Sequence, residues 1–196
     1  MSKKFELTTE TKTLFGRTLY RIRALIAFSC VAAGELGGWV EKEENLSQEG
    51  NAWVYGNAEV YGNARVYDNA EVYGNAWVYG NAEVYGNARV YDNAEVYGNA
   101  CVYGNARVCG NARVCGNAWV AKHTHLLQIG AIGSRDDFTT FVRSKAKSIL
   151  VACGCFSGTI DEFEARVKEV HAGTKHEETY LAAIKLAKLQ MEDVEV

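Results

Sequence analysis

The sequence predicts a mainly β protein built on a parallel β-helix, with a small β unit before it and a mixed unit after it. The main observation is a Gly-Asn-Ala-x-Val-Tyr hexapeptide that recurs from about residue 50 to residue 120. Twelve copies follow one another without insertion, with their alanines running from Ala52 to Ala118. A fixed six-residue period is typical of a parallel β-helix, in which each repeat forms one short strand and one turn.

The chemistry of one repeat supports this class. Ala58 and Val60 stand two residues apart and point to one side of a strand, while Glu59 and Tyr61 point to the other. Gly-Asn or Asp-Asn then supplies residues that tolerate a positive φ, as a tight corner requires. A helix is excluded, because each Gly costs about 1 kcal/mol relative to Ala. Residues 53–76 recur letter for letter as residues 77–100, which indicates an internal duplication.

The charges at the x position predict the size of one coil. Residues one coil apart stack at about 4.8 Å, and like charges placed directly opposite each other are destabilising. Two repeats per coil would stack four glutamates, and four repeats per coil would stack three arginines. Three repeats per coil pair Arg65 with Glu83 and leave only Arg89 over Arg107 as like charges. We therefore expect a triangular coil of three hexapeptides and about four coils in the regular tract.

These residues resemble a known group. Val-Tyr-Gly-Asn-Ala-x is similar to the hexapeptide of left-handed β-helix proteins, and its Gly-Asn-Ala and Tyr pattern resembles the YdcK-type β-solenoid repeat of bacterial and phage proteins. The flanks at residues 17–22, 34–40 and 153–159 resemble the same group. The resemblance spans nearly the whole chain and implies a left-handed parallel β-helix. It identifies an architecture better than an activity, since members are labelled transferases by analogy.

Composition narrows the class of function. The chain has 196 residues and a formal net charge of −3, so no basic excess indicates a nucleic-acid partner. The first residues lack the apolar core of a signal peptide, and no apolar run is long enough to predict a membrane helix. We expect no membrane partner and a cytoplasmic location. The six cysteines fit a reducing compartment, because they have no disulfide-rich spacing.

Residues 1–48 predict an N-terminal β-hairpin cap. Alternating apolar residues over 4–28 indicate a hairpin with its turn at 15–17, and residues 34–48 form a Gly-rich crossing into the first coil. The solenoid is assigned residues 49–121. Trp39 and Val40 are expected to pack across its open N-terminal end. A cap is needed because an uncovered solenoid end exposes strand edges and an apolar cross-section.

Residues 122–196 predict a C-terminal unit of strands and two helices. Strands are expected over 125–132, 138–143 and 148–155. Helices are expected over 160–171 and 175–191, each with an apolar stripe. Two capping boxes, Thr159 with Glu162 and Thr174 with Glu177, are expected to begin these helices.

The positions of the histidines do not predict an active site. All four histidines lie outside the repeats, at His123, His125, His171 and His176. Hexapeptide acyltransferases, which the repeat resembles, place a catalytic histidine beside a groove. A metal held by His123 and His125 is a weaker alternative, because zinc needs a third ligand and an acid to orient the set. We expect no catalytic residue, no metal and no cofactor.

The cysteines and the Ser-Gly-Thr run receive structural interpretations. Cys153 and Cys155 stand two apart on a predicted strand, which is neither the spacing of a zinc site nor that of a redox pair, so we expect buried small residues. Cys109 and Cys115 replace Tyr in the outward position and are expected to be free thiols. Residues 157–159 indicate a turn and a helix N-cap.

The outward aromatic residues are the candidate binding site. With three hexapeptides per coil, nine tyrosines form three columns, and three tryptophans lie beside them. Tyr and Trp anchor protein interfaces and sugar platforms, although such ladders also stabilise a sheet by stacking. The set comprises Trp53, Tyr55, Tyr61, Tyr67, Tyr73, Trp77, Tyr79, Tyr85, Tyr91, Tyr97, Tyr103 and Trp119.

The sequence therefore predicts a non-enzymatic scaffold that binds a protein partner, either a host protein or a second copy in a homo-oligomer. One version is a phage-encoded protein that neutralises a host factor, as the family context suggests. The first alternative is an acyl-CoA-dependent acyltransferase of the hexapeptide class, with a site between subunits near His123 or His125. The second alternative is carbohydrate binding by the exposed aromatic residues.

Overall fold

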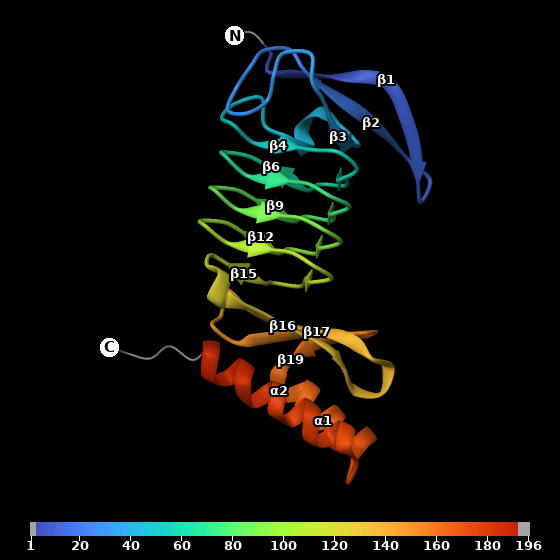
Figure 1. Ribbon diagram of the computed structural model, residues 1–196, viewed down its shortest axis with the longest axis vertical. Coiled ribbons are helices and arrows are strands. Elements are labelled where there is room, and N and C mark those ends of the chain that lie inside the picture. The colour runs from blue at the N-terminus through green and yellow to red at the C-terminus, as the bar shows by residue number, and fades with distance from the viewer. Residues whose placement is uncertain (1–2, 192–196) are drawn as a thin grey trace, which may run out of the picture.

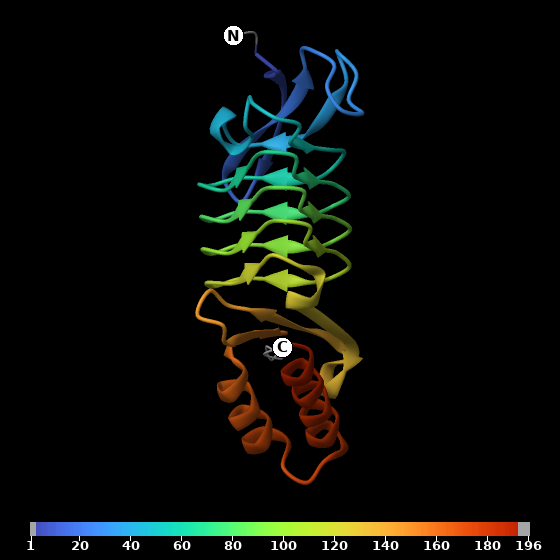
Figure 2. The same ribbon diagram turned by 90° about the vertical axis from the view of Figure 1, so that its left-hand side faces the viewer.

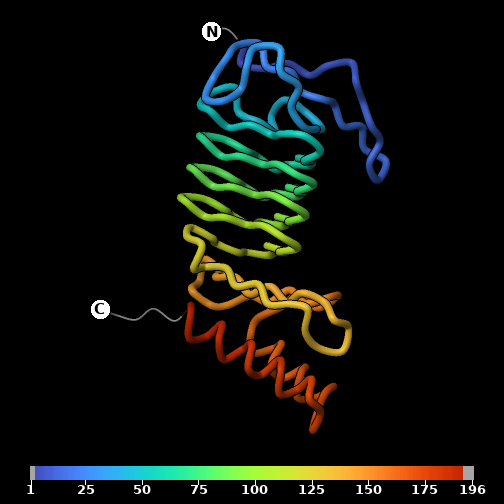
Figure 3. Tube along the Cα trace, viewed as in Figure 1, coloured from blue at the N-terminus to red at the C-terminus, as the bar shows by residue number. Residues whose placement is uncertain are grey.

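The computed structural model describes residues 3–191, so the first two and last five residues of the predicted terminal units lie outside it. Three parts are stacked along the long axis (Figures 1 and 2): an N-terminal β unit, the solenoid, and a C-terminal sheet with two helices. The trace in Figure 3 follows the chain down the solenoid one coil after another. The predicted class, a mainly β chain built on stacked parallel coils with a C-terminal sheet and two helices, is confirmed.

The solenoid consists of short strands in three parallel sheets, which form the three sides of the coil. We name each side after one of its strands: the β10 face, the β11 face and the β12 face. The β10 face holds β4 (Trp53–Val54), β7 (Glu71–Val72), β10 (Arg89–Val90) and β13 (Arg107–Val108). The β11 face holds β5 (Glu59–Val60), β8 (Trp77–Val78), β11 (Glu95–Val96) and β14 (Arg113–Val114). The β12 face holds β6 (Arg65–Val66), β9 (Glu83–Val84), β12 (Cys101–Val102) and β15 (Trp119–Val120).

The register confirms the triangular coil of three hexapeptides. Arg65 pairs with Glu83, Glu71 with Arg89, and Glu95 with Arg113 on neighbouring strands. The Ala and Val of every repeat point inward and are fully or almost fully buried, so they form one continuous apolar core. Burial of these small side chains is the main source of stability, since each buried CH₂ contributes about 0.8 kcal/mol.

The corners are held by ladders of asparagine side chains. In the ladder beside the β10 face, Asn51, Asn69 and Asn87 each donate from Nδ2 to Oδ1 of the asparagine one coil further on, at 3.0, 3.2 and 3.3 Å. The residue before each asparagine has a positive φ, which most L-residues avoid. Asp68 and Asp92 take that position in two repeats, both with φ of 60°. The Oδ2 atom of Asp92 accepts a hydrogen bond from Gly110 N at 3.1 Å, which continues the stacking at this corner.

The N-terminal unit is a long hairpin joined to the first coil. β1 (Phe5–Leu14) and β2 (Arg17–Ala24) pair in antiparallel fashion, and β2 pairs with β3 (Leu36–Val40). The expectation that Trp39 and Val40 cover the open end is wrong. β3 pairs in parallel with β5 and forms an additional rung, in which Val40 points into the core. Trp39 points outward and packs against Leu19.

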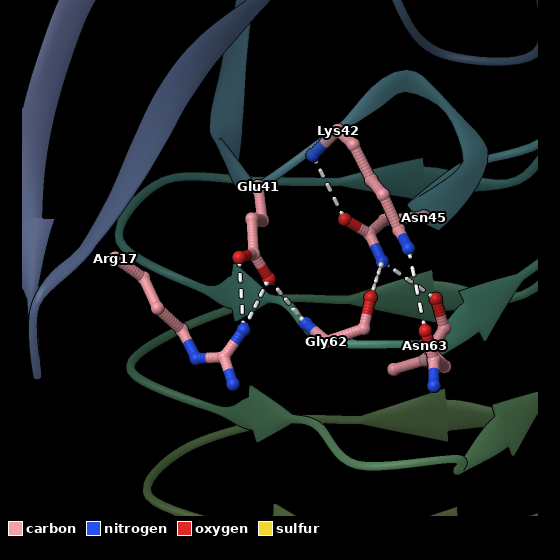
Figure 4. A network of polar contacts seen from close by, with 7 residues as sticks. Arg17, Glu41, Lys42, Asn45, Gly62 and Asn63 are labelled. Carbon is pink, nitrogen blue, oxygen red and sulfur yellow. Dashed lines mark hydrogen bonds and ion pairs between the residues drawn. The ribbon is translucent and has the colours of Figure 1, made fainter.

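Polar contacts fix this unit onto the solenoid (Figure 4). Arg17 Nη1 donates to both carboxylate oxygens of Glu41, and Glu41 Oε2 accepts from Gly62 N at 2.6 Å. Burial tends to raise the pKa of Glu41, but the Gly62 N–H and Arg17 outweigh it and lower the pKa. Asn45, in the 3₁₀ helix η1 (Glu43–Asn45), donates to the carbonyls of Gly62 and Ala64. The open end itself receives Lys4, whose Nζ donates to the carbonyls of Glu49, Gly50 and Ala52.

The C-terminal unit is a four-stranded antiparallel sheet covered by two helices. The strands are β16 (Leu126–Ile132), β17 (Asp137–Arg143), β18 (Ile149–Cys153) and β19 (Phe156–Thr159). The helices are α1 (Ile160–His171) and α2 (Lys175–Met191), which lie on the side of the sheet away from the solenoid (Figure 1). Two further 3₁₀ helices, η2 (His123–His125) and η3 (Gly133–Arg135), connect the strands. None of the described helices is long and apolar enough to cross a membrane.

Both helices have the predicted bounds, and the capping box of Thr159 and Glu162 is confirmed. At the second helix Glu177 N donates to Thr174 Oγ1, while Glu177 Oε2 accepts from Gly173 N. The strand predicted over 148–155 is confirmed as β18, which ends at Cys153 because Gly154 has a φ of 55° and turns the chain. The turn predicted at residues 157–158 is wrong, because these residues belong to β19, while Thr159 is the helix N-cap as predicted.

Candidate functional site

The tyrosines form stacked ladders on all three faces. Neighbouring rings are parallel, with centroids 4.8–5.1 Å apart and interplanar angles of 3–11°. Apart from the buried Tyr61, the ladder rings are half-buried. Tyr55 stands at the start of its column and places its hydroxyl 3.3 Å from Cys30 Sγ in the N-terminal unit. The ladders therefore contribute cross-rung packing and still leave part of each ring exposed to solvent.

The phenol groups are held neutral. Burial is the largest cause that raises the pKa of Tyr61 and Tyr97 to about 12. For Tyr91 the largest cause is its hydrogen bond with Cys109, followed by burial, and the pKa rises to about 12 although Arg107 acts to lower it. The influence of Arg107 reaches Tyr73 as well, so this arginine lies close to the ladder of the β10 face.

The prediction that Trp53 points outward and is available for binding is wrong. Its side chain is fully buried, in edge-to-face contact with Phe5 and Phe28 of the N-terminal unit. The other two are half-buried and also meet parts outside the repeats. Trp77 has its centroid 6.0 Å from the ring of Phe15, at the tip of the hairpin. Trp119 donates from Nε1 to the Tyr103 hydroxyl and lies under Lys145 Nζ, which is 4.8 Å from the ring centroid.

The β11 face is covered at both ends. The hairpin covers its start, where Leu19, Trp39 and Tyr61 form a buried cluster and Lys12 Nζ lies 2.5 Å from Glu59 Oε1. The C-terminal unit covers its end, where Arg113 Nη1 donates to the carbonyl of Gly154 at 3.0 Å. Only the middle of this face is therefore left open.

The β12 face also ends against the C-terminal unit. A groove of about 790 Å³ separates the last coil from the loop that holds Lys145. Its lining includes Cys101, Cys115, Trp119, Ser144 and Lys145, and it contains no histidine. The Tyr67 hydroxyl donates to Glu83 Oε2 at 3.2 Å, and Glu83 also lies 4.0 Å from Arg65 Nη1. The charges on this face are therefore balanced by one another.

The β10 face differs from both. Arg89 forms an ion pair with Glu71 at 2.9 Å, but its neighbour on the other side is Arg107. Within residues 3–191 the guanidinium of Arg107 has no acidic partner in hydrogen-bond or ion-pair contact. An open groove of about 480 Å³ runs along this face between the charged column and the asparagine ladder. It is lined by Ser29, Asn51, Asn69, Glu71, Asn87, Arg89, Asn105 and Arg107.

The histidines and cysteines are not gathered into one site. His123 and His125 lie in η2 at the exit of the solenoid, while His171 and His176 lie together beside Tyr180 at the helix turn. The interpretation of Cys155 as a buried strand residue is wrong, because it is exposed in the turn, with Arg135 Nη1 3.8 Å from its sulfur. Cys153 is half-buried against Thr139. Across the part of the chain that the structure describes, no three His, Cys, Asp or Glu residues are placed to hold a metal ion.

The remaining cysteines are free thiols, as predicted for Cys109 and Cys115. Cys115 is buried rather than outward and open, because the C-terminal sheet lies over it and Ser157 Oγ approaches its sulfur at 3.3 Å. Sequence reasoning did not include the arginines and asparagines of the β10 face in the site. The signal that could have indicated them was Arg89 over Arg107, the single like-charged pair in the predicted coil.

Fold and site together define a capped β-solenoid with one open charged and aromatic face. The YdcK Beta solenoid repeat family matches the chain at residues 64–80 and 106–121, both within the repeats. A curated relative, "Uncharacterized acetyltransferase YdcK" of Escherichia coli (strain K12), is 49% identical over 37 residues. That match covers 19% of this chain and 11% of the relative, so it extends to only a small part of the relative's length. The chain thus carries YdcK β-solenoid repeats, and the resemblance predicted for the repeats is confirmed. The family match does not include the flanking segments at residues 17–22, 34–40 and 153–159.

Proposed function

We propose that the chain is a rigid scaffold of the cytoplasm that binds a protein partner through the β10 face. One observation carries the proposal: on this face Tyr73 and Tyr91 stack beside Arg107, which has no acidic partner among the described residues. Tyr and Arg are enriched among the residues that dominate binding energy at protein interfaces. The stacked coils keep these groups at fixed spacing, which lowers the entropy lost on binding.

The partner is a host protein or a second copy of the chain. The most specific version of the proposal is a phage-encoded chain that neutralises a host factor. It is motivated by the resemblance of the repeats to those of phage proteins. Carbohydrate binding has less support, because Trp53 is buried and Trp77 and Trp119 contact Phe15 and Lys145. These rings are not open platforms on which a sugar could stack.

Site-specific photocrosslinking in living cells tests the proposal. A photoreactive amino acid replaces Asn69, in the asparagine ladder beside the β10 face, and, as a matched control, Asn81, in the ladder beside the β12 face; both positions are exposed. We expect a discrete cross-linked protein from position 69 and none from position 81. A cross-linked dimer would identify a second copy as the partner. Equal cross-linking from both positions, or none from position 69, would overturn the proposal.

An acyl-CoA-dependent acyltransferase is the second candidate, because the relative's name includes an acetyltransferase and His123 and His125 lie together in η2 at the exit of the solenoid. Coenzyme A would then raise the melting temperature, and His125→Ala would remove any acetyl transfer. A melting temperature that coenzyme A leaves unchanged would count against this candidate.

A further inference from the structure

We infer that the C-terminal end of the groove on the β10 face is a carboxylate-binding site, which takes an aspartate or glutamate side chain of a protein partner. The inference rests on the proposed function and names the chemistry by which its partner is recognised. Arg89, Arg107 and Asn105 form the site, and all three line the groove of about 480 Å³.

The charge of the column favours an anion at this site. Arg89 and Arg107 are in register on β10 and β13, so their Cα atoms lie about 4.8 Å apart, the usual spacing of neighbouring strands. Like charges in this position repel. Every other arginine of the solenoid has a glutamate in ion-pair contact: Arg65 has Glu83, Arg89 has Glu71 and Arg113 has Glu95. Arg107 is the exception within the described residues, and an anion between it and Arg89 would remove the repulsion.

The direction of the asparagine ladder favours an anion at the same end of the groove, independently of the arginines. Asn51, Asn69 and Asn87 all donate toward the C-terminal end of the solenoid. Asn105 accepts the last of these bonds, and its own Nδ2 donates to no other described residue. Aligned amides polarise one another, so the partial positive charge gathers at the donor end of the chain. That end is Asn105, beside Arg107.

The net charge of the groove favours a carboxylate over phosphate. Glu71, Arg89 and Arg107 together carry a net charge of +1, which a single negative charge balances. A phosphate group with two negative charges would be repelled by Glu71. The planar guanidinium groups match the two oxygens of a carboxylate, which favours bidentate hydrogen bonds. Asn69 and Asn87 keep further amide groups in the groove for the peptide backbone of the partner.

The neighbouring aromatic rings extend the site. Tyr91, whose hydroxyl is hydrogen-bonded to Cys109, is close enough to Arg107 to feel its charge, and it stacks on Tyr73 with centroids 4.8 Å apart. Asp92 directly follows Tyr91, and its Oδ2 already accepts a hydrogen bond from Gly110 N. An acidic segment with an apolar residue next to its acid would therefore contact both the arginines and the ladder.

Titration with short peptides tests the inference. The probe is an acetylated hexaglutamate peptide, the matched peptide is hexaglutamine, and inorganic phosphate is a third ligand. Binding to the full chain is followed by the NMR signals of the arginine Nε–H groups and the asparagine side-chain amides. The variants are Arg107→Gln and, as a control on the β12 face, Arg65→Gln.

We expect hexaglutamate to shift the signals of Arg107 and Asn105, and Arg107→Gln to weaken binding by about tenfold, the loss of one charged hydrogen-bond donor pair. Arg65→Gln should leave the affinity unchanged. Equal binding of hexaglutamine, equal losses in both variants, or tighter binding of phosphate would overturn the inference. Cross-linking at position 69 without any effect of Arg107→Gln on hexaglutamate would refute the carboxylate site and leave the scaffold proposal standing.

Discussion

Arg89 and Arg107 lie in register on adjacent parallel strands of the β10 face, with two positive charges on neighbouring rungs. Arg107→Glu replaces this repulsion by an attraction and extends the alternation that begins with Glu71 and Arg89. We expect the variant to be more stable by about 0.5–1 kcal/mol, the range of cross-strand charge pairs. Urea unfolding followed by circular dichroism measures the difference.

Arg113→Glu is the matched control for this prediction. Arg113 already pairs with Glu95 and donates to the carbonyl of Gly154, so the same substitution there creates a like-charged pair and removes a contact with the C-terminal unit. It should lower stability. If both variants shift stability in the same direction, the charge register does not govern the energetics of the faces.

Trp53→Ala is expected to destabilise the protein by about 3–5 kcal/mol, as large-to-small changes in a packed core do. Trp53 is buried between the first coil and Phe5 and Phe28 of the N-terminal unit. Trp77→Ala is the control, because Trp77 occupies the same x position in a later repeat and is only half-buried. Thermal unfolding of both variants compares them, and equal losses would show that Trp53 does not join the cap to the solenoid.

Gly80→Ala is expected to cost about 1–2 kcal/mol, the penalty of a left-handed conformation for an ordinary L-residue. Gly80 has a φ of 73°, and an added Cβ would lie 3.1 Å from the backbone nitrogen of Gly98. Gly80→Asn should cost less, because Asn tolerates this region and Asp68 and Asp92 occupy equivalent corners. Equal melting temperatures of the two variants would contradict this explanation of the corner.

Stability is expected to fall in alkaline solution. In the unfolded chain tyrosine ionises near pH 10, whereas in the folded chain the pKa of Tyr61, Tyr91 and Tyr97 is raised to about 12. Between these values the folded state binds more protons, so the stabilisation is present below about pH 10 and is lost as the pH rises toward about 12.

Tyrosinate absorbance and circular dichroism, recorded together between about pH 9 and about pH 12, test this prediction. The absorbance should rise late and together with unfolding. A tyrosinate transition centred near pH 10, with the β signal intact, would show that the ladders are not protected from solvent.

The sequence was sufficient to predict the solenoid, because every repeat carries the same local information. The inward Ala and Val, the positive-φ corner and the outward charges each constrain the coil, and all agree on three repeats per coil. The helix starts were equally predictable, since the box formed by Thr159 and Glu162 is a local signal.

Contacts between distant segments could not be predicted in the same way. Trp53 has the same sequence context as Trp77, but Phe5 and Phe28 come from far along the chain and bury only the first of them. The turn at Gly154 was missed because a continuous apolar run over residues 149–153 does not show where the strand ends. The site was predicted only in part, because the repeats are alike on all three faces and do not show which faces the N-terminal and C-terminal units cover.

The decisive measurement is calorimetry of hexaglutamate binding to the Arg107→Glu variant, made on the same sample whose melting temperature is determined. We expect the variant to melt at a higher temperature than the wild type and no longer to bind the peptide. Peptide binding retained in this well-folded variant would contradict the assignment of the β10 face as the partner-binding surface.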